Sequence, residues 1–178
     1  LEAVRAGLMG RDVRAWRPLS EWLGEGMALA PAGRAGVEMA VLDALARHHR
    51  VPLCVMLGGA GTVLDIDMTV TVGDVAHAAE SARSILKRGI TTLKVKVGAL
   101  SPDQDAARMV AIHEVAPQAR LFADANGGYD VAEALAFVKE LERAGVPLAL
   151  LEQPVPASDL AGMAEVARRS KVRVCADE

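Results

Sequence analysis

Charged residues recur at regular intervals along the second half of the chain, each in or at the end of an apolar stretch. They are Lys94 and Lys96 in LKVKV (93–97), Asp124 ending RLFAD (120–124), Glu152 ending LALLE (148–152), and Asp177 and Glu178 ending VRVCADE (172–178). From Lys96 to Asp177 the steps are 28, 28 and 25 residues. Carboxylates brought together repel one another unless a cation neutralises them. A ligand set of carboxylate oxygens favours Mg²⁺ or Mn²⁺ over zinc or copper.

The stretches that carry these residues alternate with helical patterns. Strands are predicted at 65–72, 93–97, 120–124, 148–152 and 171–177, and helices at about 75–88, 103–115, 130–144 and 159–169. Asp130 and Glu133 have the spacing of a capping box, and Gly145 is a typical helix end. Strands that alternate with helices in this way indicate βα units and a parallel sheet.

Such a sheet fits either a doubly wound α/β fold or part of a (β/α)₈ barrel. No G-x-G-x-x-G follows the first predicted strand, which argues against the dinucleotide-binding version. In a barrel the carboxyl ends of the strands converge on one mouth, where one charged residue per unit would meet the others.

Each charged residue also has a structural explanation. An Asp at the end of a strand is commonly a loop or cap residue, and Lys94 and Lys96 would suit the surface of an edge strand. Asp177 and Glu178 compete for one role, because adjacent strand residues point to opposite faces. The recurrence at four successive strands favours a functional cluster. The four histidines lie in predicted helices and supply no competing ligand set.

Composition narrows the class of protein. The chain has 178 residues, of which 52% are hydrophobic, enough for one sizeable core. A net charge of −3 without a basic block argues against nucleic-acid and anionic-membrane partners, and no apolar run approaches a membrane span. Cys54 and Cys175 lie in apolar stretches and are predicted to be buried thiols of a cytosolic protein. We therefore expect a cytoplasmic location, with no signal peptide visible at Leu1.

The first third of the chain is less regular. Residues 1–33 contain glycine and proline punctuation and look irregular, a helix is predicted from about Gly36 to His49, and LGGAG (57–61) is predicted to be a flexible junction. We expect a boundary there, between residues 1–60 and 61–178.

Four motifs in this order resemble the enolase superfamily: KVKVG (94–98), DANGGY (124–129), EQPVP (152–156) and CADE (175–178). Within it they are most similar to the muconate-cycloisomerase-like subgroup (the mandelate racemase/muconate lactonizing enzyme family), and among these to the dipeptide epimerases. Residues 37–59 resemble the segment from the family's capping domain into its barrel, and TVGD (71–74) the end of the first barrel strand.

The resemblance implies an α+β capping domain followed by a modified (β/α)₈ TIM barrel. Residues 1–60 would be the end of the capping domain and the junction, and 61–178 the first part of the barrel, with about five βα strands. The family's lysine on the sixth strand and its substrate-reading residues on the last strand are not in this sequence. The chain is therefore either a piece of a longer enzyme or a degenerate relative that cannot work as written, and we expect the first.

The resemblance also implies the chemistry, which is abstraction of the proton α to a carboxylate through an enediolate held by Mg²⁺ (or Mn²⁺). By position, Asp124, Glu152 and Asp177 would bind the metal, Lys96 would be the acid/base, and Lys94 would support it. Asn126, Gln153 and Glu178 would orient these groups.

The substrate would be a small carboxylate, with epimerisation or racemisation of a dipeptide or amino-acid derivative expected. Muconate cycloisomerisation and o-succinylbenzoate synthesis use the same framework and stay open. Relatives commonly form homo-oligomers, and we expect one here. Two alternatives of another class are a non-catalytic metal-binding or assembly module and a structural α/β domain whose strand-end charges are coincidental.

Overall fold

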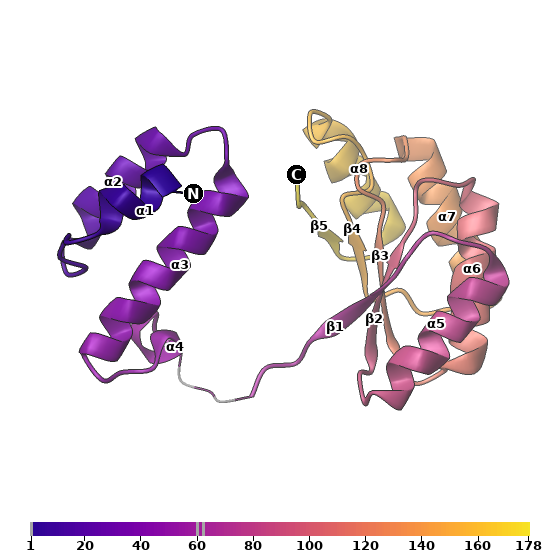
Figure 1. Ribbon diagram of the computed structural model, residues 1–178. Coiled ribbons are helices and arrows are strands. Elements are labelled where there is room, and N and C mark those ends of the chain that lie inside the picture. Colours follow the sequence, from indigo (N-terminus) through magenta and orange to yellow (C-terminus); the bar gives the residue numbers. More distant parts are fainter. Residues whose placement is uncertain (1, 60, 62) are drawn as a thin grey trace. The chain divides into compact units, whose positions relative to one another are not determined.

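The computed structural model describes residues 2–59, 61 and 63–178, which fall into two compact units, Leu1–Leu64 and Asp65–Glu178. Figure 1 shows a helical first unit and a second unit of alternating strands and helices. The predicted junction at 57–61 lies partly outside the described residues. Within the described part of the chain, no helix is both long and apolar enough to cross a membrane.

The first unit consists of α1 (Glu2–Leu8), α2 (Trp16–Gly26), α3 (Pro31–His48) and α4 (Leu53–Met56). The prediction that residues 1–33 are irregular was wrong, because α1 and α2 lie there. In α2, Leu19 and Leu23 are one helical turn apart and both are buried. Pro18 lies in its first turn, where a backbone N–H has no partner within the helix and its loss costs little.

The second unit is built on a parallel sheet. Among the described residues it has five strands: β1 (Asp67–Val70), β2 (Thr92–Lys96), β3 (Arg120–Asp124), β4 (Leu150–Glu152) and β5 (Val174–Cys175). Each strand pairs with the next in the order β1-β2-β3-β4-β5. A doubly wound sheet reverses its strand order, whereas this order runs steadily in one direction, as in an arc of a barrel.

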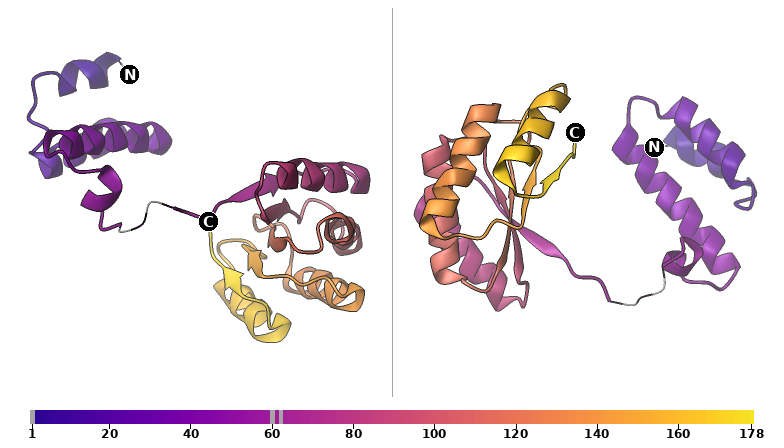
Figure 2. Two further views of the ribbon diagram at one scale, coloured as in Figure 1. Left: turned by 90° about the horizontal axis from the view of Figure 1, so that it is seen from below. Right: turned by 180° about the vertical axis from the view of Figure 1, so that it is seen from behind.

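Four helices connect the strands: α5 (Val75–Lys87), α6 (Pro102–Val115), α7 (Val131–Ala144) and α8 (Leu160–Ser170). They lie together on the outer face of the curved sheet (Figures 1 and 2). The predicted βα units are thus confirmed. The observed β5 is shorter than the predicted strand at 171–177, because its ladder runs only alongside the short β4.

Alternation along β2 explains why LKVKV contains lysines. Leu93 and Val95 are fully buried in the core that α5 and α6 cover. Successive strand residues point to opposite faces, so Lys94 and Lys96 project from the inner face, away from the helices. The same alternation in β3 sends Leu121 and Ala123 into the core and Asp124 to the inner face.

The predicted signals at the start and end of α7 are confirmed. Asp130 accepts a hydrogen bond from the backbone of Glu133 while the Glu133 side chain accepts one from the backbone of Asp130, which is the predicted capping box. Gly145 closes α7 at φ 70°. Ser101 and Gln104 form a second capping box at the start of α6.

The loops after β2 and β3 pack backbone against backbone. Gly98 has φ 86°, and a Cβ on it would lie 2.7 Å from the carbonyl oxygen of Ala125. A Cβ on Gly128 would lie 2.5 Å from the carbonyl oxygen of Gly98. Both glycines are therefore required by contact between the KVKVG and DANGGY segments, at the carboxyl end of the sheet.

The two thiols were predicted to be buried, and this prediction was wrong. Cys54 and Cys175 are both free and exposed. Cys54 belongs to the four-residue helix α4, which has no buried residue. Cys175 lies in β5, which has a strand neighbour on one side only within the described residues. An apolar sequence context thus did not produce burial, because burial requires covering elements on that face.

Replacing Gly128 with Ala should lower the free energy of unfolding of the full-length protein by about 1–3 kcal/mol, the usual cost of overpacking. The added methyl group would force the two loops apart. Urea denaturation measures the change. The matched control is Gly36→Ala within α3, where a Cβ meets nothing within 4 Å and which should be neutral or stabilising by up to about 1 kcal/mol. Equal stability of both variants would contradict the observed loop contact.

Candidate active site

The register of the sheet places charged residues from three strands in one row. Lys96 pairs with Asp124, and Asp124 pairs with Glu152. Glu152 in turn pairs with Cys175 of β5. Aligned residues of a parallel sheet point to the same face, so the row presents an ammonium group and two carboxylates at the carboxyl end of the inner face.

Lys94 lies two residues before Lys96 on the same face of β2, and its side chain contacts the carboxylates of this row. Its Nζ donates to Glu152 Oε1 at 2.7 Å and lies 3.0 Å from Asp124 Oδ2. Lys96 Nζ donates to Asp124 Oδ2 at 2.6 Å and to Asn126 Oδ1 at 2.8 Å. Asp124 is fully buried, whereas the side chains of Glu152, Lys94 and Lys96 are 13%, 20% and 32% exposed. The cluster is thus a compact, partly shielded group of two cations and two anions.

Mutual pairing keeps Asp124 and Lys94 charged. Burial raises the pKa of the Asp124 carboxyl, but hydrogen bonds from Lys96 and Lys94 lower it more, and its pKa lies below the usual range. Burial lowers the pKa of the Lys94 ammonium, but hydrogen bonds to Glu152 and Asp124 raise it more, and its pKa lies above the usual value. Asp124 and Lys94 therefore carry full charges at neutral pH.

Asn126 connects this row to the end of the chain. Its Nδ2 donates to Glu178 Oε1 at 3.0 Å, while its backbone N–H donates to Asp124 Oδ1 at 3.1 Å. Its φ of 45° lies in the left-handed region, which Asn tolerates better than most residues. The Asn side chain thus stands between Lys96 and Glu178.

Gln153 connects β4 to the segment after β5. It is buried, its Oε1 accepts from the backbone N–H groups of Asp177 at 2.8 Å and Glu178 at 3.2 Å, and its Nε2 donates to the Val155 carbonyl at 2.9 Å. These bonds fix the backbone that carries Asp177.

The structure does not bring all three predicted metal ligands together. Asp124 and Glu152 share Lys94, but the Asp177 carboxylate has no hydrogen bond or ion pair within the described residues. In that part of the chain, no group of three or more His, Cys, Asp or Glu side chains is placed to hold a metal ion. The donor chemistry still fits a hard divalent cation, since two carboxylates already converge on one positively charged atom, Lys94 Nζ.

Three buried polar residues next to the site were missed from the sequence: Asp105 and Arg108 of α6, and Tyr129 in the loop after β3. Asp105 Oδ1 accepts from Arg108 Nη1 at 2.8 Å, and Asp105 Oδ2 accepts from Tyr129 Oη at 2.7 Å. A charged pair three residues apart, on the helix face that also carries Met109 and Ile112, was the signal that could have found them.

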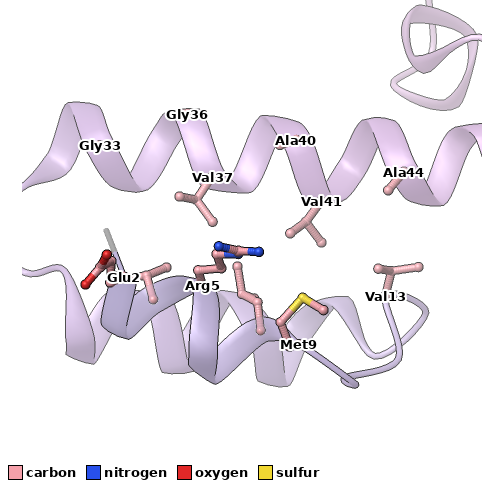
Figure 3. A pocket seen from close by; sticks show the side chains of 12 residues that line it. Glu2, Arg5, Met9, Val13, Gly33, Gly36, Val37, Ala40, Val41 and Ala44 are labelled. Atoms are coloured by element: carbon pink, nitrogen blue, oxygen red, sulfur yellow. The ribbon is translucent and has the colours of Figure 1, made fainter.

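An apolar cavity in the first unit offers no comparable chemistry. It has a volume of about 660 Å³ and lies between α1 and α3 (Figure 3). Glu2 and Arg5 are its only charged lining residues among those described, and the remainder are glycines and apolar side chains such as Val37 and Val41. The cluster on the sheet is therefore the candidate active site.

The sequence of this chain is similar to those of known proteins. The family model described as "Enolase C-terminal domain-like" matches residues 76–178. The aromatic dipeptide epimerase of Herpetosiphon aurantiacus is 48% identical over 178 residues, covering 100% of this chain and 50% of that protein. The chain thus spans about half the length of this curated relative.

Solved structures show the same fold. The mandelate racemase/muconate lactonizing protein from Herpetosiphon aurantiacus superposes with a TM-score of 0.90 at 48% identity, over 99% of this chain and 49% of that one. The dipeptide epimerase from Methylococcus capsulatus, complexed with a Mg ion, superposes with a TM-score of 0.81 at 32% identity, over 99% and 53%. The chain therefore belongs to the enolase superfamily, in the mandelate racemase/muconate lactonizing enzyme family that includes the dipeptide epimerases.

Proposed function

We propose that this chain provides part of the active site of a dipeptide epimerase, which removes and returns the proton α to the substrate carboxylate. The observation that carries the proposal is the single row of Lys96, Asp124 and Glu152, with Lys94 reaching into it. The 48% identity to an aromatic dipeptide epimerase supports the reaction type and a dipeptide substrate.

Asp124, Glu152 and Asp177 would hold Mg²⁺. Asp124 and Glu152 converge on one cationic atom, Lys94 Nζ, and the backbone N–H of Asp177 donates to the side chain of Gln153, the residue after Glu152. The Mg ion in a structural relative supports this assignment. When bound, the ion would supply positive charge to the substrate carboxylate as negative charge develops on its oxygens.

Lys96 would accept the α-proton at Nζ on one face of the substrate. Its partners, Asp124 and Asn126, fix the position of Nζ. Lys94 would hold positive charge beside the carboxylates and help to bind the substrate carboxylate. Inversion at the α-carbon requires a proton donor on the opposite face as well, so Lys96 would serve one of two faces.

Replacing Lys96 with Ala in the full-length protein should reduce α-proton exchange of a dipeptide in D₂O by a factor of about 10² to 10⁴, the usual contribution of a positioned acid/base. NMR loss of the α-proton signal measures the rate, and Mg²⁺ binding should persist. The control Lys139→Ala removes an exposed lysine of α7 and should leave the rate unchanged. An unchanged rate in Lys96→Ala would exclude Lys96 as the base.

Mg²⁺ should raise the melting temperature of the full-length protein, since a ligand at about 100 times its Kd stabilises by about 2.7 kcal/mol. Addition of EDTA should reverse the shift. Asp124→Asn and Glu152→Gln keep the side-chain shape but remove a ligand charge, and should abolish the Mg²⁺-dependent shift. The melting temperature with Mg²⁺ is compared with that of the same variant without Mg²⁺, because both substitutions also disturb the ion pairs with the lysines.

Asp103→Asn is the matched control for this titration, because Asp103 is exposed on α6. It should retain the full Mg²⁺-dependent shift. A shift that survives in Asp124→Asn and Glu152→Gln would place the metal elsewhere, and no shift in the unmodified protein would favour a structural role for the strand-end charges.

A further inference from the structure

An ion pair buried behind the candidate active site has no part in the chemistry proposed above. Arg108 and Asp105 of α6 have side chains that are 1% and 0% exposed, and their closest charged atoms are 2.8 Å apart. They lie on the helix face that packs against the sheet, among apolar neighbours such as Met109 and Ile112.

Arg108 holds the carboxyl ends of two strands. Its Nη1 donates to the carbonyl oxygen of Lys96 at 2.8 Å, and its Nη2 donates to the carbonyl oxygen of Thr71 at 2.8 Å. Lys96 is the last residue of β2, and Thr71 follows β1 directly. The planar guanidinium group can satisfy both carbonyls and Asp105 at once, because its donors form a rigid fork.

Asp105 holds the two loops that follow β2 and β3. Its Oδ2 accepts from the backbone N–H of Gly98 at 2.8 Å and from the hydroxyl of Tyr129 at 2.7 Å. Tyr129 is 2% exposed. Burial and the bond to Asp105 raise the pKa of the Tyr129 hydroxyl, which therefore stays a donor at neutral pH.

Stability alone does not explain this arrangement. Desolvation of a buried ion pair costs about as much as the pairing gains, and apolar side chains of similar volume often stabilise a core equally well or better. Arg108 Nε is also buried without a hydrogen-bond partner among the described residues, which adds to the cost. What an apolar pair would not supply is a fixed position for the Lys96 backbone.

We propose that Arg108 and Asp105 are positioning residues that hold Lys96 in register with Asp124 and Asn126. The inference rests on the proposed function, because it assigns Lys96 the proton transfer. Side-chain bonds fix Nζ of Lys96 at one end, and Arg108 fixes its carbonyl at the other. Displacement of a reacting group by about 1 Å can reduce a rate about 10²-fold.

Arg108→Lys in the full-length protein tests the inference. A lysine keeps the charge beside Asp105 but lacks the fork that reaches both carbonyls. The rate of α-proton exchange at saturating substrate should fall about tenfold or more, whereas KM should change less than about twofold, because substrate contacts are unaltered. Tyr129→Phe removes only the hydroxyl bond to Asp105 and should show the same split with a smaller loss, about threefold.

Ile112→Val is the matched control, since Ile112 is a fully buried member of the apolar core one turn further along α6. It should lower the melting temperature without reducing the exchange rate. The inference would be overturned if Arg108→Lys or Tyr129→Phe exchanged protons at the unmodified rate, or lost activity only in proportion to the loss of melting temperature seen in Ile112→Val.

If Arg108→Lys does not fold, Tyr129→Phe decides by itself. The unmodified protein is measured first with the same dipeptides. Absence of exchange in it would refute the proposed function and this inference together, whereas exchange that persists in the variants would refute the positioning role alone.

Discussion

Parallel pairing between β2, β3 and β4 determines which charged side chains become neighbours. The register aligns Lys96 with Asp124 and Asp124 with Glu152, so that residues 28 positions apart in the chain become lateral neighbours. A slip of one residue in any pair would send one member of the row into the apolar layer beneath the helices. The packing of Leu93, Val95, Leu121 and Ala123 against α5, α6 and α7 therefore determines where the charges lie.

The charges on the inner face are tolerated because they balance each other. Asp124 is fully buried, yet it accepts hydrogen bonds or contacts from both lysines, and Lys94 is shared with Glu152. Among the described residues, loss of Asp124 would leave Lys96 without its anionic partner, and loss of Lys94 would leave Glu152 without its cationic partner. A shielded charge without a partner is costly in a medium of low dielectric constant. A divalent cation bound at this cluster would compete with the lysines for the same carboxylates.

Contacts on the outer side of the sheet connect the row of charged residues to helix α6. Gly98 and Gly128 allow the loops after β2 and β3 to touch through their backbones, and Asp105 binds both loops from α6. Arg108 also donates hydrogen bonds to backbone carbonyls at the carboxyl ends of β1 and β2. A helix on the outer face of the sheet thus sets the geometry of side chains on its inner face, which links core packing to the candidate active site.

Features that arise from local sequence patterns could be predicted without the structure. Apolar alternation predicted the strands, and the Asp130 capping box and Gly145 predicted the bounds of α7. The recurring charges at strand ends predicted that Lys96, Asp124 and Glu152 lie in one row. Features that require one segment to cover another could not be predicted from local patterns. These features are the helices within residues 1–33, the exposure of Cys54 and Cys175, and the burial of Asp105 with Arg108. Burial results from contact between segments that are far apart in the sequence. A local sequence pattern does not indicate which distant segments will cover a residue.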